Sequence, residues 1–272
     1  MEPTNPTYYP TIKQSFGLLV LWFLISILTA IPLGVISALH LNIQNVTTLK
    51  SAGTLLAYCA SFVWIIYVAK KRIKTQGLWE LKWKHGKVPF MTVVVGLIMT
   101  LALSVLIDPI TELIPMPESI KKMFEALMQP NIFSFITIVI MAPLLEEAFF
   151  RGVVLEGFLR NYSPWKAIIW SSMIFGAAHM NPWQTISASL IGVLIGWIYV
   201  KTNSLIPGII LHFFNNLIGF SVMAFVDQDM DSLYLSKVIE SELAYFGLLG
   251  LAAGVLVLGY IWLDRRDDLV IT

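Results

Sequence analysis

The chain has 272 residues, of which 57% are hydrophobic and only 13% are charged, and its mean hydropathy is +0.76. A soluble globular domain usually carries about 25% charged residues, so this composition excludes that class. A formal net charge of +1 gives no reason to expect a nucleic-acid partner. The apolar runs are long rather than short and alternating, which predicts an all-α polytopic membrane protein and not a β-barrel.

About eight transmembrane helices are predicted, within a single transmembrane domain that covers residues 1–272. The apolar runs cover residues 16–39, 52–69, 88–107, a fourth run that starts at residue 132, and then 167–179, 185–200, 205–226 and 243–263. The fifth run has only about thirteen residues and barely reaches across a thin membrane core. Between the third and fourth runs, residues 118–128 are expected to form a short amphipathic helix at the outer interface.

Basic residues set the predicted orientation. Residues 70–74 read KKRIK, and Lys82, Lys84, His85 and Lys87 follow in the same loop. Loops rich in lysine and arginine usually face the cytoplasm. Counting crossings from this loop places the other basic clusters on the same side. We therefore expect an integral, multi-pass protein of the plasma membrane, embedded in the lipid bilayer with both termini cytoplasmic.

The fourth run ends in the segment MAPLLEEAFFRG, residues 141–152, which carries Glu146, Glu147 and Arg151. A charge in the middle of a membrane helix costs about 2.5–3.5 kcal/mol on insertion scales, so such residues usually have a function. Glu147 precedes Arg151 by four residues, the favoured orientation for a helical ion pair. That pair is more simply read as structural, which leaves Glu146 as the candidate functional carboxylate.

Two of the four histidines, His179 and His212, lie at or within apolar runs, where an imidazole needs a partner or water. His40 and His85 lie in loops and are expected to be ordinary interfacial residues. If residues 161–164 form the turn of a helical hairpin, Glu146 and His179 stand about sixteen residues from it on opposite arms. Both would then reach the same depth in the membrane.

The seventh run carries His212 and Asn216, which are four residues apart and therefore share a helical face near its cytoplasmic start. Phe175 lies four residues before His179. Taken singly, His212 and Asn216 could form hydrogen bonds between helices, and Phe175 could be a residue that only packs against its neighbours. Taken together at matching depths, these residues predict one active-site cavity enclosed by the helices.

Three motifs at these positions resemble those of the CPBP family of membrane proteases. The family comprises the type II CAAX prenyl endopeptidases and their bacteriocin-processing or immunity-type bacterial relatives. The motifs are EExxxR at Glu146, Glu147 and Arg151, FxxxH at Phe175 and His179, and HxxxN at His212 and Asn216. The resemblance covers a predicted protease core of residues 133–219.

The resemblance implies that Glu146 and His179 activate the water that attacks a peptide carbonyl, while His212 and Asn216 stabilise the oxyanion. A buried carboxylate is a competent general base near neutral pH, and N–H groups in a dry site stabilise a developing negative charge strongly. Glu147 and Arg151 would then position Glu146.

No cofactor is required by this interpretation, although a zinc ion is an alternative. Glu146, His179 and His212 could supply three ligands, a usual number for catalytic zinc. Against zinc, Asn216 is a poor ligand and the sequence has no HExxH motif. The resemblance extends to metal-free, glutamate-dependent enzymes, and the metal-free mechanism is favoured.

The sequence therefore predicts a membrane-embedded endopeptidase that cleaves near the cytoplasmic membrane face. Its substrate would be a peptide or membrane protein, and the resemblance adds a prenylated CAAX-type C-terminus as a candidate. One alternative is a proton-coupled transporter with a buried Glu–His relay, but no inverted repeat is visible. The other is a non-proteolytic immunity or scaffold protein, against which the complete motif set argues.

Overall fold

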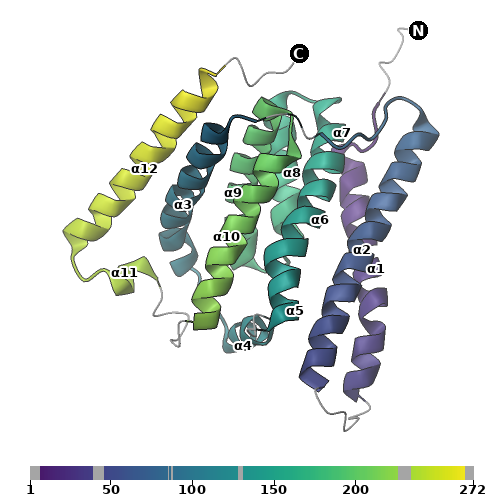
Figure 1. Cartoon of the computed structure of the whole chain (residues 1–272), viewed down its shortest axis with the longest axis horizontal. Coiled ribbons are helices and arrows are strands. Elements are labelled where there is room, and N and C mark those ends of the chain that lie inside the picture. Colours follow the sequence, from purple (N-terminus) through teal and green to yellow (C-terminus); the bar gives the residue numbers. More distant parts are fainter. Residues whose placement is uncertain are drawn as a thin grey trace. The chain divides into compact units, whose positions relative to one another are not determined.

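The computed structural model describes residues 7–38, 46–84, 86, 88–127, 131–225 and 234–266. Its secondary structure over these residues is helical, without a β-strand (Figure 1). Seven of the described helices are long and apolar enough to cross a membrane: Ile12–Val35, Thr48–Gln76, Phe90–Glu112, Ile132–Leu159, Pro182–Thr202, Leu205–Ala224 and Glu242–Asp264. The predicted class, an all-α polytopic membrane protein, is confirmed. The predictions for His40 and His85 lie outside the described residues.

The predicted fifth span is too short to cross a bilayer. Helix α8, Pro164–Ala177, has 14 residues, or about 21 Å at 1.5 Å per residue against a hydrocarbon core of about 30 Å. Two tight turns end it, with Met180 in the left-handed region at φ 53. Asn181 then caps the next helix, α9 (Pro182–Thr202), through a bond from the Gln184 amide to its side chain. Among the described residues, seven helices are thus long enough to span a membrane, against about eight predicted spans, and α8 is the predicted span that falls short.

The chain divides into two compact units, which are described separately. Unit 1 comprises residues 1–83 and 130–174, and unit 2 comprises residues 84–129 and 175–272. The predicted amphipathic segment is present in unit 2 as α4, Glu118–Leu127. The prediction of a single transmembrane domain is not tested by this division.

Unit 1 is built from α1 (Ile12–Ala38) and α2 (Val46–Gln76), which lie side by side (Figure 1), and from the interrupted helix of residues 132–159. Trp22 of α1 packs on Phe62 of α2 with ring centroids 5.0 Å apart, and Phe62 meets Phe149 at 6.2 Å. This aromatic cluster joins α1 and α2 to the segment that carries the glutamates.

Tyr8 and Tyr9, near the N-terminus, connect the end of α2 to the helix–helix turn at residues 159–164 through hydrogen bonds. The Tyr9 amide donates to Gln76 Oε1 at 2.8 Å, and Trp79 Nε1 donates to the Tyr9 carbonyl at 2.8 Å. On the other side, Asn161 accepts from the Tyr8 amide at 3.0 Å and donates to the Tyr8 carbonyl at 2.8 Å. These bonds join three segments that are distant in sequence.

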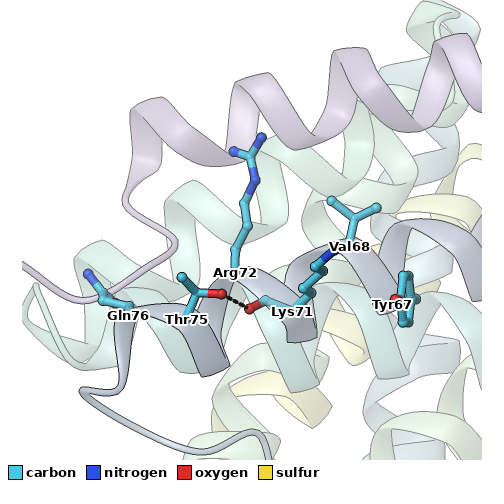
Figure 2. Close-up of a pocket in the computed structure, with 6 residues that line it drawn as sticks. All are labelled: Tyr67, Val68, Lys71, Arg72, Thr75 and Gln76. Atoms are coloured by element: carbon cyan, nitrogen blue, oxygen red, sulfur yellow. Dashed lines mark hydrogen bonds between the residues drawn. The ribbon is translucent and has the colours of Figure 1, made fainter.

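An open pocket of about 580 Å³ lies at this end of α2 (Figure 2). The residues that line it, all from α2, are Tyr67, Val68, Lys71, Arg72, Thr75 and Gln76. Arg72 also lies over the ring of Tyr9, at 5.9 Å from its centroid. The pocket contains none of the sequence-predicted site residues.

Replacing Gly157 with alanine should lower the free energy of unfolding by about 1–3 kcal/mol, the usual cost of overpacking. An added Cβ would lie 2.8 Å from both the N and the O atom of Pro10, which are backbone atoms and cannot rotate away. Gly17→Ala is the matched control, because nothing lies within 4 Å of its added Cβ. Thermal unfolding in detergent would compare the two. Equal melting temperatures would contradict the close approach at Pro10.

Unit 2 is organised around α3 (Phe90–Glu112), which packs against α9, α10 (Leu205–Phe225) and α12 (Glu242–Asp264). Trp197 of α9 stacks on Tyr260 of α12 with centroids 5.0 Å apart. At the start of α10, the Leu205 amide donates to the Lys84 carbonyl at 2.8 Å. The short helix α11, Leu235–Val238, is tied to α3 by a bond from the Leu235 amide to Asp108. The packing against α3 and the bond at Leu205 hold α10, which carries His212 and Asn216.

Candidate active site

The two glutamates lie on a short α-helix between two π-helical segments. Helix α6, Ala142–Phe149, follows η1 (Ile136–Met141) and precedes η2 (Phe150–Leu155). At the first junction the Ala142 amide bonds to the Thr137 carbonyl, five residues back. Pro143, which has no amide hydrogen, stands next to it and interrupts the regular i→i−4 ladder. Such π turns are rare and occur frequently at functional sites.

Glu147 and Arg151 form a buried ion pair, as their spacing predicted. Arg151 Nη1 donates to Glu147 Oε1 at 2.8 Å, and the two side chains are 2% and 0% exposed. All six residues of η2 are buried, so the guanidinium is enclosed by protein. The pair therefore holds α6 and η2 together inside unit 1.

Glu146 accepts a hydrogen bond from a residue that the sequence analysis did not identify. The hydroxyl of Tyr58 on α2 donates to Glu146 Oε1 at 2.5 Å, across 88 positions of sequence. Tyr58 lies in the middle of the second apolar run. A phenol hydroxyl in apolar surroundings usually has a hydrogen-bond partner. A tyrosine in an apolar run therefore indicated that such a partner exists, but not that it is Glu146.

In unit 2, one phenyl ring contacts both predicted histidines, His179 and His212. Phe175, 3% exposed, lies edge-to-face against His179 with centroids 5.3 Å apart and against His212 at 5.7 Å. The interplanar angles are 87° and 79°. The end of α8 and the middle of α10 therefore bring three of the predicted residues together.

A backbone hydrogen bond sets the tautomer of His179. Its Nδ1 atom lies 3.1 Å from the carbonyl oxygen of Phe175. A carbonyl can only accept, so Nδ1 must carry the hydrogen, and in the neutral ring Nε2 then has the lone pair. His179 thus presents Nε2 as the atom that can take up a proton or bind a metal.

His212 and Asn216 lie one turn apart on α10. The His212 side chain is buried, with 6% of its surface exposed, and Asn216 is half-buried. The neighbouring Asn215 donates from Nδ2 to Asn216 Oδ1 at 3.4 Å. The Asn216 side chain has two N–H donors on Nδ2 and an acceptor in Oδ1.

The predicted site residues therefore fall in two sets. Glu146, Glu147 and Arg151 lie in unit 1, together with Tyr58, which was not predicted. Phe175, His179, His212 and Asn216 lie in unit 2. That the two sets share one cavity stays a prediction. Among the described residues, no three His, Cys, Asp or Glu side chains gather as a metal-binding group. The alternative zinc site at Glu146, His179 and His212 likewise remains a prediction.

Comparison with known protein families places these motifs in one known domain. Residues 128–218 match the family model of the type II CAAX prenyl endopeptidases, described as Rce1-like. All three motifs, from Glu146 to Asn216, lie inside the matched stretch. This stretch is similar to the Rce1-like domain of that family. The predicted resemblance to the CAAX-type membrane proteases is confirmed for this third of the chain.

Two curated proteins are similar to parts of this chain. The UPF0177 protein YxdF of Lactococcus lactis is 28% identical over 166 residues, which are 60% of this chain and 89% of that protein. An uncharacterized 24.3 kDa protein of Escherichia coli is 30% identical over 86 residues, 30% of this chain. The match spans only 40% of the length of the E. coli protein. No solved structure matches the chain.

Proposed function

We propose that the chain is a membrane-embedded endopeptidase that hydrolyses a peptide bond near the cytoplasmic face of the membrane. The observation that carries this proposal is the Rce1-like domain at residues 128–218, which contains a carboxylate, two imidazoles and an amide at the family's motif positions. A carboxylate inside an apolar membrane helix is energetically costly, which favours a catalytic use for Glu146.

Glu146 and His179 are proposed to activate water. Glu146 takes a proton from the water, whose oxygen attacks the peptide carbonyl carbon and forms a tetrahedral intermediate. The Nε2 atom of His179 carries a lone pair and can hold or relay this proton. As the intermediate collapses, the C–N bond breaks and the proton passes to the leaving amine. The products are a carboxylic acid and a free amine.

His212 and Asn216 are proposed to donate hydrogen bonds to the oxyanion of that intermediate. Donors aimed at a developing negative charge in a water-poor site usually provide the largest stabilisation in such reactions. Their spacing of one helical turn on α10 lets both side chains approach a single oxygen atom. The Asn216 amide group and the His212 ring both carry N–H groups, the kind of donor required here.

The proposed mechanism needs no metal. If the enzyme binds zinc, Glu146, His179 and His212 would hold the ion, which would polarise the attacking water. Metal analysis of the purified protein separates the two mechanisms. A metal-free preparation that keeps full activity with a chelator supports the proposal, and activity that is lost with chelator and restored by zinc contradicts it.

Replacing Asn216 with alanine should lower kcat by about 10²–10³-fold, the usual effect of removing one oxyanion donor. Ile218→Ala, on the same helix with a side chain 37% exposed, is the control for a general disturbance of α10. Single-turnover cleavage and circular dichroism would be measured for both variants. A rate for Asn216→Ala equal to that of the control would remove Asn216 from the mechanism.

The function is tested by presenting the purified protein in lipid vesicles with a panel of peptides. The panel pairs each CAAX-type peptide with the same sequence lacking the prenyl group, and adds membrane-proximal peptides without a CAAX end. Mass spectrometry would detect the cleaved bond. Cleavage of the prenylated members alone would assign the substrate class. A folded protein that cleaves no member would contradict the proposal and favour an immunity, scaffold or transport protein.

A further inference from the structure

We propose that Tyr58 is a positioning residue that holds the carboxylate of Glu146 in its reactive orientation. This inference rests on the proposed role of Glu146 as the base. Tyr58 belongs to none of the three motifs and lies 70 residues before residue 128, where the match to the Rce1-like family begins. Its assignment comes from its contacts within unit 1.

The first observation is the hydrogen bond itself. Tyr58 Oη donates to Glu146 Oε1 at 2.5 Å, a separation typical of a bond between a hydroxyl and a carboxylate. A glutamate side chain has three rotatable torsions and would otherwise sample several orientations. Fixing one of its two oxygens restricts the plane and the direction of the carboxylate.

The second observation is that Tyr58 is itself held in place. Its ring packs on Phe62, one turn along α2, with centroids 5.0 Å apart. Phe62 in turn contacts Phe149, which lies three residues after Glu146 on the same helix. The α2 helix and α6 therefore meet through both a polar and an aromatic contact at this point. A donor anchored in this way can fix its acceptor.

The third observation is the contrast between neighbouring glutamates. Glu147 accepts a hydrogen bond from the guanidinium of Arg151 at 2.8 Å. Arg151 also acts electrostatically on Glu146, but the donor to Glu146 from α2 is the neutral phenol of Tyr58. A neutral donor orients a carboxylate while allowing it to take up and release a proton, as a general base must. The two glutamates thus differ in a hydrogen-bond donor, a guanidinium for Glu147 and a phenol for Glu146.

The test compares Tyr58→Phe with Tyr67→Phe, a control nine residues further along α2 whose side chain is 60% exposed. Removal of the Tyr58 hydroxyl should lower kcat by about 10–100-fold, the scale on which misplaced catalytic groups act, with KM within about twofold of the parent value. The melting temperature should stay near that of the parent protein. Tyr67→Phe should match the parent protein in all three quantities.

A parent-like kcat for Tyr58→Phe, in a protein that loses activity on Glu146→Gln, would overturn the inference while leaving the proposed function intact. Failure of the proposed function is a separate result, in which the parent protein cleaves no peptide or Glu146→Gln remains fully active. If Tyr58→Phe does not fold, 4-fluorophenylalanine at position 58 keeps the size of the ring and removes the donor. The same loss of kcat, about 10–100-fold, is then expected, and a parent-like kcat would overturn the inference.

Discussion

Replacing Glu146 with glutamine should lower the rate of peptide cleavage by about 10²–10⁴-fold, the contribution usual for a general base. Glutamine has nearly the same shape but cannot accept the proton of the attacking water. Its amide oxygen can still accept the hydrogen bond from Tyr58, which keeps the contact between α2 and α6. The loss should therefore fall on kcat, with little change in KM or in the melting temperature. Steady-state cleavage by the purified variant measures it.

Glu147→Gln is the matched control, because the two glutamates are adjacent and the substitution is identical. Its activity should fall less than that of Glu146→Gln, since Glu147 bonds to Arg151 and not to the proposed nucleophilic water. Its melting temperature should fall more, because Arg151 would lose a charged partner in a buried site. The opposite order of activities would mean that the roles of the two glutamates are exchanged.

Replacing Arg151 with methionine should lower the free energy of unfolding by about 3–5 kcal/mol, the usual cost of breaking a buried ion pair. The substitution keeps an unbranched side chain in the buried η2 segment but leaves the Glu147 carboxylate, which is 0% exposed, without its guanidinium. Reversible unfolding in mixed micelles measures the change.

Two comparisons isolate the buried charge as the cause. Lys122→Met breaks a pair with Glu118 that has the same i,i+4 spacing, but both side chains are 70% exposed, so its effect should be about 0.5 kcal/mol or less. Replacing both members of the buried pair, Glu147→Leu with Arg151→Met, should recover much of the lost stability. An Arg151→Met effect as small as that of Lys122→Met would contradict the structural importance of the pair.

Most of the helical framework could be predicted from the sequence, because hydropathy over about twenty residues is a local property. The third run, predicted at residues 88–107, is α3 at Phe90–Glu112, and the sixth, predicted at 185–200, is α9 at Pro182–Thr202. The fifth run was predicted as a short span at residues 167–179, whereas α8 ends at Ala177, and hydropathy alone does not reveal where the helix ends. That end depends on a left-handed residue, Met180, for which methionine is not a usual signal.

The candidate site was predictable to the extent that its residues share helical faces. The pairing of Glu147 with Arg151 and the contact of Phe175 with His179 both follow from a spacing of four residues. The hydrogen bond from Tyr58 joins residues 88 positions apart and depends on how α2 packs on α6. The π-helical segments on either side of α6 likewise have no characteristic sequence period. Both features required the structure.

Cross-linking in membranes tests whether the two sets of site residues lie close together. The chain has one cysteine, Cys59, so Cys59→Ala provides a cysteine-free background. In it, Glu146→Cys with His179→Cys should react with a short bifunctional thiol reagent, because a carboxylate and an imidazole that activate one water must lie close together. Ile132→Cys with His179→Cys is the control, since Ile132 lies about 20 Å from Glu146 along the helix axis. A cross-link in the first pair and none in the control is the predicted result, and no cross-link between positions 146 and 179 would contradict a shared active site.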